Sequence, residues 1–200
     1  MPLKFNGTGV ENVTYNGTVL GKVIYNGVVV WEGIKSNLIP ILTGSGTNMG
    51  GGFTCTSHTL DIKAYNKTNY SRNFDGWWNA FDGTDTRAYN GDDNDWGAWE
   101  HYSYIDVALP KAVHFLEGFF KWRVWNYGSF VIRGQQEGTG TWYTVYTNYT
   151  SHGQSRWYTY SHSGALSHTD KKFTKLRVYT EHTGWWGNVQ PIQVQITKYK

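Results

Sequence analysis

Short segments that alternate apolar and polar residues recur along most of this chain, and they restrict it to one class of fold. Such alternation places every second side chain on one face of a β-strand, so that one face is buried and the other meets solvent. Turn signals separate the segments, and the sequence contains no convincing amphipathic helix. This spacing is typical of a β-sandwich or jelly roll, so the sequence predicts an all-β fold rather than an α/β enzyme. The segments are 104–107, 119–124, 129–133, 142–147, 157–160, 175–179 and 192–197.

The composition supports one folded core and narrows the classes of partner. Apolar residues make up 39% of the 200 residues, which is enough to bury a full core in one main domain. The net charge is +3 and the basic residues are scattered rather than gathered in a stripe, so no nucleic-acid partner is expected. The sequence has no run of about 18 apolar residues, so membrane insertion is not expected.

Cysteine usage and the first residues bear on the cellular location. Cys55 is the only cysteine, so neither an internal disulfide nor a thiolate zinc site can form. The N-terminus lacks the apolar run of a signal peptide. The expected routes out of the cell are therefore cell lysis and assembly into a particle.

The first 33 residues contain a repeat of period ten in which an aromatic residue precedes Asn-Gly. Each Asn-Gly pair favours a tight hairpin, because both residues accept the positive φ angles of a type I′ turn. So small a meander is marginal alone, and it needs either the main domain or further copies of itself as a packing surface. We expect 1–33 to serve attachment or oligomerisation, 34–40 to be a linker and 41–200 to form the main domain. The three repeats begin at Phe5, Tyr15 and Tyr25.

This repeat reads aromatic-Asn-Gly-Thr, then Val-Ile-Tyr-Asn-Gly, then Val-Trp. It resembles the N-terminal segments of tail-associated and other structural proteins from phages of Gram-positive hosts. The resemblance covers 1–33 and implies contact with other virion or tail proteins through this segment. It also implies that the protein is found in the virion, or extracellularly after release.

Three motifs follow in a fixed order in the main domain. The first motif is Asn-Ala-Phe-Asp-Gly at 79–83, followed by Ile-Asp-Val at 105–107. The second lies within 130–146 and consists of Phe-Val-Ile-Arg-Gly and then Gly-Thr-Trp-Tyr-Thr-Val-Tyr. The third is Phe-Thr-Lys-Leu-Arg-Val-Tyr at 173–179. This order is similar to the discoidin, or coagulation-factor type C, family, which includes the family 32 carbohydrate-binding modules. The resemblance covers about 38–200 and implies a galactose-binding-like jelly roll.

In carbohydrate-binding members of that family, the Asp-Gly turn often holds a structural calcium ion. Carried over by position, the ligands come from this turn and from the last strand, where Gln193, or alternatively Gln195, replaces the family's glutamate. A neutral amide weakens such a site, because Ca²⁺ takes about six to eight oxygen ligands and favours carboxylates. The alternative is a metal-free Asx turn at Asp82. The implied ligands are the backbone carbonyls of Asn79 and Thr84, the side chain of Asp82, and Thr86 and Gln193.

Aromatic and polar residues gather in two predicted loops, 89–101 and 181–188. Sugar rings have apolar C–H faces and rims of hydroxyls, so an exposed aromatic ring beside His, Arg or Asp suits them. The resemblance places the ligand at the end of the jelly roll where these loops meet. The predicted ligand-binding residues are Trp78, Arg87, Asp95, Trp96, Trp99, His101, Trp185 and Trp186, with Arg123 as a further basic contributor.

Several tryptophans have a second interpretation as core residues. Neighbouring residues on extended or loop backbone tend to face opposite ways, so we expect one member of each pair, Trp77-Trp78 and Trp185-Trp186, to be exposed. Four further tryptophans lie in or beside alternating segments, which favours burial. They are Trp122, Trp125, Trp142 and Trp157.

Catalytic signatures are missing from the sequence. It contains neither Gly-x-Ser-x-Gly nor His-Glu-x-x-His, and its seven histidines show no metal-ligand spacing. Asp95 and Glu100 can be named as a carboxylate pair for glycoside hydrolysis, but any acid-rich loop supplies such a pair. The acidic run 92–95 is not an EF-hand, since the third ligand position falls on Trp96. We therefore do not expect an enzyme.

These features predict a non-catalytic carbohydrate-binding protein, a phage tail or virion component that recognises glycans on the host surface. Linked copies of a weak site gain affinity, so a homo-oligomer is expected. Two alternatives stay open: a purely structural virion protein that uses the jelly roll for protein contacts, and an accessory module of a glycoside-processing enzyme.

Overall fold

The computed structural model is built almost entirely from β-strands, so the prediction of an all-β fold is confirmed. It describes residues 4–5, 8–9, 13–15, 18–20, 22–25, 28–64, 70–73, 76–88, 98–153, 156–183 and 187–200. Among these residues the one helical element is a short 3₁₀ helix, η1 (Trp77–Phe81). The described part of the chain contains no helix with the length and hydropathy to cross a membrane.

The N-terminal strands form three separate two-stranded sheets where the Asn-Gly repeats predict hairpins. The residues that flank an Asn-Gly pair face each other, as Tyr15 does Thr18 and Tyr25 does Val28. The hairpin pairing is confirmed, whereas the separate role of 1–33 stays a prediction. The strands are β1 (Lys4–Phe5), β2 (Thr8–Gly9), β3 (Val13–Tyr15), β4 (Thr18–Leu20), β5 (Lys22–Tyr25) and β6 (Val28–Glu32).

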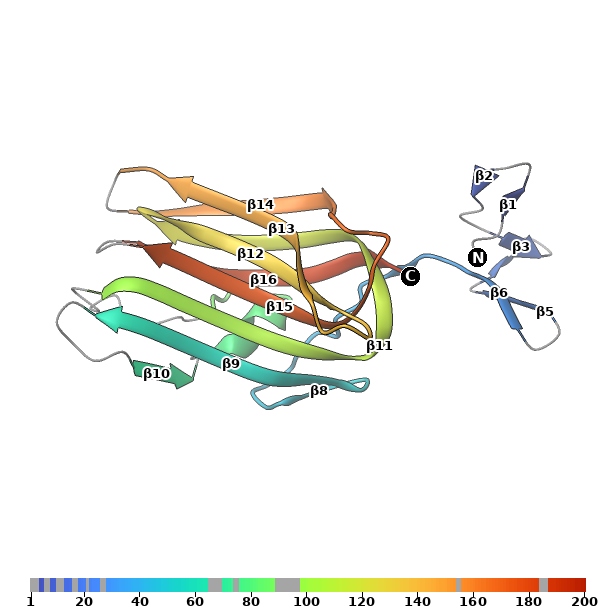
Figure 1. Ribbon diagram of the computed structural model, residues 1–200, viewed down its shortest axis with the longest axis horizontal. Helices are drawn as coiled ribbons and strands as arrows, with labels where there is room; N and C mark the ends of the chain where they lie inside the picture. Colours follow the sequence, from blue (N-terminus) through green and yellow to red (C-terminus); the bar gives the residue numbers. More distant parts are fainter. Residues whose placement is uncertain are drawn as a thin grey trace.

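Two antiparallel sheets follow and share one long strand, β11 (Ala98–Trp125) (Figure 1). In the larger sheet the order is β10, β9, β11, β15, β12, β13, with β8 beside β9. In the smaller sheet the second half of β11 pairs with β14 and β16, and β7 pairs with the C-terminal end of β16. The other strands are β7 (Lys35–Ser36), β8 (Asn48–Gly50), β9 (Phe53–Ala64), β10 (Tyr70–Asn73), β12 (Tyr127–Gln136), β13 (Trp142–Ser151), β14 (Trp157–Ala165), β15 (Lys172–Thr183) and β16 (Asn188–Tyr199).

The long strand β11 passes from one sheet to the other at a break in its pairing. Its register with β15 shifts between Ala108 and Val113. Pro110 lies in this stretch and has no N–H to donate to a neighbouring strand. The strand curves around one end of the sandwich there (Figure 1). The patterns at 104–107 and 119–124 predict two strands, but the structure joins them into one.

The core lies between the two sheets and is rich in aromatic rings. Trp122 of β11 and Phe130 of β12 stack with their centroids 4.7 Å apart and an angle of 5° between the rings. Phe115 and Phe173 also meet from opposite sheets, with centroids 4.8 Å apart. All four side chains are buried. Full burial of a large apolar side chain contributes about 1.5–3 kcal/mol, so these contacts hold the two sheets together.

Strand alternation separates the tryptophans that face the core from those that do not. Trp122 is 1% exposed, as predicted. Trp125 lies on the other side of the same strand and is half-buried. Trp142 and Trp157 are also half-buried, so the prediction that these three are core residues is wrong. Each lies at the end of a strand in an outward position, which apolar character alone does not reveal.

Candidate functional site

The turn that follows η1 lies over the smaller sheet and is anchored at both of its ends. Before the turn, the Phe81 carbonyl accepts a hydrogen bond from the Leu42 N–H at 2.9 Å. After it, the Ala88 N–H donates to the Pro191 carbonyl of β16 at 2.8 Å. Residues 83–87 between these anchors are exposed. The turn therefore presents its side chains to solvent next to β11 and β16.

Side-chain hydrogen bonds fix the conformation of this turn. Asp82 Oδ1 accepts from the Thr84 backbone N–H at 2.7 Å and from the Thr84 hydroxyl at 2.8 Å. The Thr86 N–H donates to the Thr84 hydroxyl oxygen at 3.1 Å. From the last strand, Gln193 Nε2 donates to the Thr84 carbonyl at 2.8 Å. This pattern matches the Asx turn at Asp82 that the sequence offers as the alternative to calcium.

The same residues, as arranged, do not fit a calcium ion. Asp82 is the one carboxylate in the predicted ligand set, and its Oδ1 already accepts two hydrogen bonds within the turn. Gln193 presents a donor, its amide nitrogen, which satisfies the Thr84 carbonyl that would otherwise face a cation. Ca²⁺ needs several oxygen acceptors with carboxylate charge, so this donor set fits a hydrogen-bonded turn.

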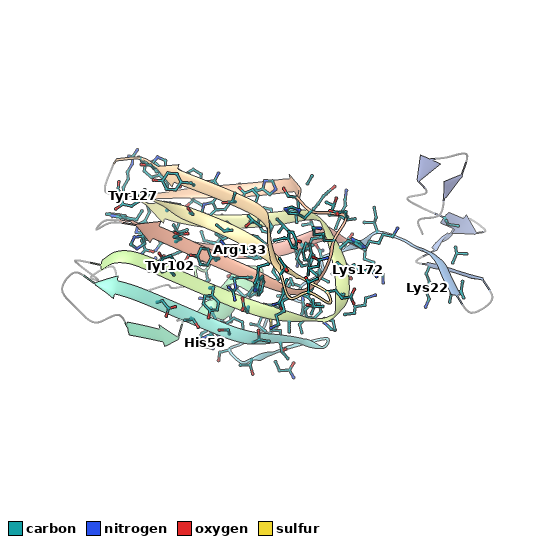
Figure 2. The ribbon with its side chains drawn as sticks, in the orientation of Figure 1. Lys22, His58, Tyr102, Tyr127, Arg133 and Lys172 are labelled. Atoms are coloured by element: carbon teal, nitrogen blue, oxygen red, sulfur yellow. The ribbon has the colours of Figure 1, made fainter. Side chains whose placement is uncertain are left out.

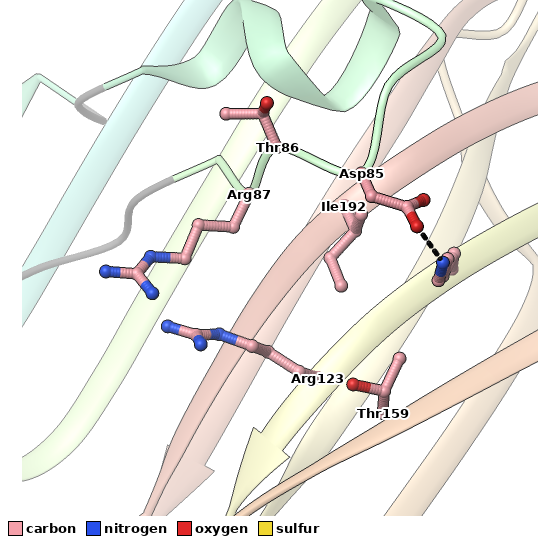
Figure 3. A pocket seen from close by; sticks show the side chains of 7 residues that line it. Asp85, Thr86, Arg87, Arg123, Thr159 and Ile192 are labelled. Carbon is pink, nitrogen blue, oxygen red and sulfur yellow. Dashed lines mark hydrogen bonds and ion pairs between the residues drawn. The ribbon is translucent and has the colours of Figure 1, made fainter.

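A pocket of about 500 Å³ opens between this turn and the smaller sheet (Figure 3). Figure 3 shows the guanidinium groups of Arg87, from the turn, and Arg123, from β11, next to each other. The pocket thus brings together a predicted ligand-binding residue and the predicted further basic contributor. Its lining residues are Asp85, Thr86, Arg87, Lys121, Arg123, Thr159 and Ile192.

Arg123 is held in place on two sides. Its Nε and Nη2 donate to Gln190 Oε1 at 2.8 and 2.6 Å, and Gln190 is fully buried. Its guanidinium carbon lies 3.9 Å from the centroid of the Trp157 ring, a cation–π contact. Trp157 in turn contacts Trp125, with ring centroids 5.7 Å apart. Because this guanidinium is already oriented, it loses little conformational entropy when a ligand binds.

An ion pair between Lys121 and Asp85 lies at the pocket, with 2.7 Å between Nζ and Oδ2 (Figure 3). The Asp85 side chain is 70% exposed, so the pair contributes little to stability. Counting this carboxylate, the lining side chains carry three positive charges, on Arg87, Lys121 and Arg123, and one negative charge. The pocket is therefore rich in hydrogen-bond donors and suits a ligand rich in acceptor oxygens.

Of the predicted ligand-binding residues, the structure places Arg87 at the pocket and Trp78 elsewhere. Trp78 packs at the edge of the core, where its ring meets that of Trp77 at 6.2 Å and 82°. Trp77 is buried and Trp78 is partly exposed, as expected of this pair. Trp99 and His101 belong to β11, but their side chains lie outside the described residues. Also outside them are Asp95, Trp96, Trp185 and Trp186, whose role stays a prediction.

Sequence reasoning missed four lining residues: Asp85, Lys121, Thr159 and Ile192. Lys121 does have a signal, because it lies between the buried residues Phe120 and Trp122 and must therefore point outward, as Arg123 does. Thr159 has none, since its place opposite Arg123 depends on the pairing of β14 with β11. Long-range pairing of this kind is not encoded in a local pattern.

The thiol of the chain is unsuited to nucleophilic chemistry at neutral pH. Cys55 is 5% exposed. Burial raises the pKa of its thiol to about 12, because the thiolate would lose its hydration. In the described part of the chain, no group of three or more His, Cys, Asp or Glu residues is placed to hold a metal ion. The chemistry that the pocket itself offers is hydrogen bonding and charge, because the residues that line it are polar or charged except for Ile192.

No family model matches the chain, and no curated protein matches it. Among solved structures, a family 29 carbohydrate-binding module is 10% identical with a TM-score of 0.37, over 82% of this chain and 88% of the module. A variant of such a module complexed with cellulohexaose is 11% identical with a TM-score of 0.38, over 82% and 91% of the two chains. Another, complexed with mannohexaose, is 10% identical with a TM-score of 0.36, over 80% and 89%. At these scores the likenesses carry no argument about the ligand, and the discoidin resemblance stays a prediction.

Proposed function

We propose that this chain is a non-catalytic carbohydrate-binding protein and that the pocket over the smaller sheet holds a sugar. The observation that supports this most directly is the arrangement of Arg123. Its guanidinium lies on the Trp157 ring and is oriented by two hydrogen bonds to Gln190. A fixed set of N–H donors in a pocket is the kind of surface that the hydroxyl rim of a sugar ring requires.

A sugar matches the pocket in charge and in size. Its hydroxyl oxygens accept hydrogen bonds from guanidinium and ammonium groups, and its hydroxyl protons can be donated to the Asp85 carboxylate at the rim. The volume of about 500 Å³ lies within the range of about 300–1,000 Å³ found for small-ligand pockets. Asp85 and Arg87 lie on the turn and Arg123 lies on β11, so one sugar can contact two walls of the pocket at once.

Binding to a glycan array tests this proposal. We expect Arg123→Ala to weaken binding roughly tenfold or more, because hydrogen bonds to a charged group contribute about 1.5–3 kcal/mol. Lys198→Ala is the matched control, since Lys198 is an exposed cation paired with Glu117 that does not line the pocket. The proposed site is excluded if the wild-type protein binds no glycan, or if Arg123→Ala binds as well as the wild type does.

The predicted aromatic loops form a separate part of the proposal. Trp96→Ala, Trp99→Ala and Trp185→Ala each remove one ring that the sequence assigns to ligand binding. A loss of affinity in any of them would extend the site beyond the pocket. Unchanged affinity in all three would remove the loops from the site and leave the pocket as its whole extent.

We further propose that the protein is part of a virion, as a phage tail or receptor-binding component that recognises host surface glycans. We also propose that it assembles as a homo-oligomer. Two observations support this. The three N-terminal hairpins pair only within themselves among the described strands, and Ile24 on β5 is 51% exposed, which suits a protein contact. Mass spectrometry of purified particles tests the first part, and absence of the chain from them would exclude it. Light scattering of the purified protein tests the oligomer.

A further inference from the structure

The outer face of the larger sheet carries a second cluster of aromatic and charged side chains, far from the pocket in the fold. Ile105, Val107 and Val178 point into the core and are at most 1% exposed, so the residues that alternate with them in β11 and β15 point outward. We define the aromatic face as Tyr102, Tyr104, Trp142, Tyr149, Tyr179 and Arg177. Figure 2 labels Tyr102, and also Arg133, over the middle strands of this sheet.

The register of the strands aligns the aromatic face into rows. Tyr104 of β11 lies directly opposite Tyr179 of β15. Tyr102 and Tyr149 belong to the neighbouring row. This row begins at Tyr102 on β11, crosses β15 and β12, and ends at Tyr149 on β13. Strands in a sheet lie about 4.8 Å apart, so a line across four of them spans about 14 Å. A ligand that spans this line is therefore longer than one that fits inside a pocket.

Arg177 fixes one end of the aromatic face. Its Nε and Nη2 donate to the two carboxylate oxygens of Asp106 at 2.6 and 2.7 Å. Its guanidinium carbon lies 4.3 Å from the centroid of the Tyr104 ring and 4.2 Å from that of the Trp142 ring. The Asp106 side chain is only 8% exposed, so this ion pair is largely shielded from water. Both rings therefore have a defined position before any ligand arrives.

Tyr179 joins the rest of the aromatic face. The Arg133 guanidinium carbon lies 4.7 Å from the centroid of its ring, and the Tyr102 ring lies 6.3 Å away at an angle of 31°. Tyr149 is 65% exposed, whereas the other members are half-buried. Four of the five rings are thus held by contact with a guanidinium or another ring, and Tyr149 stands apart from them on β13.

The apolar part of this face is aromatic rather than aliphatic. Among the described residues the large exposed aliphatic side chains are Ile24, Ile34 and Ile41, and all three lie outside the larger sheet. The core of a protein interface combines aromatic with aliphatic side chains, whereas a sugar stacks its C–H face on aromatic rings and places its hydroxyls against charged groups. The chemistry of the aromatic face is closer to the second case.

We infer that the aromatic face is a second carbohydrate-binding surface, which takes an extended polysaccharide chain laid across the strands of the larger sheet. This inference rests on the proposed function for the class of ligand. It adds a site on the opposite side of the sandwich from the pocket, and a preference for a polymer over a short fragment. Two sites on one chain raise the affinity for a polymer without any new contact.

The test is retardation in native gels, cast at acidic pH, that contain galactomannan, glucomannan or hydroxyethylcellulose. Tyr149→Ala is the main variant, because its ring is exposed and its loss leaves the core intact; Trp142→Ala is the second. Each is expected to weaken binding to the retarding polysaccharide about tenfold. Ile41→Ala removes an equally exposed apolar side chain, 67% accessible, away from this face, and is expected to migrate as the wild type does. Urea unfolding of each variant verifies that it is folded.

The outcomes separate this inference from the proposed function. If both aromatic-face variants bind as the wild type does while Arg123→Ala binds weakly, the pocket is the only site and the inference is overturned. If the wild type binds no polysaccharide here and no glycan on the array, the proposed function fails and the inference with it. A third result also overturns the inference: the wild-type protein self-associates in light scattering, the Trp142→Ala variant does not, and neither protein is retarded in any gel. The aromatic face is then a protein contact.

Discussion

Arg177 and Arg123 lie on opposite outer faces of the sandwich, and the comparison between them shows what determines the role of such a residue. Arg177 on the larger sheet donates to a carboxylate, Asp106, and lies between two aromatic rings. Arg123 on the smaller sheet donates to an amide oxygen, that of Gln190, and lies on one ring. The first pair has no net charge, whereas the second keeps the positive charge of the guanidinium. Arg177 is therefore suited to organising a surface, and Arg123 to contacting a ligand.

The largest expected effect comes from breaking the ion pair of the larger sheet. Arg177→Ala leaves the Asp106 carboxylate largely buried without its partner, which costs about 3 kcal/mol of the free energy of unfolding. Arg123→Ala leaves a neutral amide, which costs only about 1 kcal/mol. Urea unfolding near neutral pH measures both. Equal losses in the two variants would contradict the distinction between the two arginines.

A smaller effect is expected in the turn that borders the pocket. Gln193→Glu removes the N–H that the Thr84 carbonyl accepts and places a carboxylate near Asp82, so we expect a loss of about 1 kcal/mol that added calcium restores. The melting temperature of the wild-type protein is expected to be the same with calcium and with a chelator. The control is Gln195→Glu, which loses the hydrogen bond donated to the Ile39 carbonyl but keeps an acceptor for the Ile39 N–H. It creates no paired carboxylate, so calcium is not expected to restore its stability. A calcium-dependent melting temperature in the wild type would contradict the metal-free turn.

The outer face of the larger sheet, through Tyr179, is expected to make the stability of the protein depend on alkaline pH. Burial, and to a smaller extent Glu181, raises the pKa of this phenol above its ordinary value of 10, although Arg133 opposes the shift. The folded state thus holds the proton more tightly than the unfolded state, so this contribution to stability is fully present below pH 10 and is lost as the pH rises above it. Tyr179→Phe should reduce the loss of stability between about pH 8 and about pH 11, measured by urea unfolding at each pH. An unchanged pH dependence would show that other groups control the alkaline transition.

The smallest effect on stability is expected at the rim of the pocket. Lys121→Ala breaks the ion pair with the exposed Asp85, so the free energy of unfolding should change by less than about 0.5 kcal/mol. Binding to the array should nevertheless weaken, because Lys121 lines the pocket. Lys198→Ala breaks an equally exposed pair with Glu117 and should change neither quantity. Identical binding by the two variants would exclude Lys121 from the site.

Local pattern was sufficient for several parts of the fold and the site. Period-two alternation determines that Phe120 and Trp122 face the core while Lys121 and Arg123 face outward. The Asp-Gly sequence after η1 offers the Asx turn at Asp82 as the alternative to calcium, because a short acidic side chain can bond the backbone two residues later. These features depend only on residues that are close in sequence, so local patterns are enough to predict them.

Local sequence was enough for the all-β class, the N-terminal hairpins and the outward position of Arg123, whereas it left the turn at Asp82 open between a calcium site and an Asx turn. The packing of the strands had to be seen to learn that β11 serves both sheets, that Trp142 and Trp157 lie on outer faces, and which residues meet across the strands. Tyr104 faces Tyr179, and Arg123 is oriented by Gln190, through pairing between strands distant in sequence. Such register results from the packing of the whole core, because a strand can be shifted along its partner without any change in its own alternation of two residues.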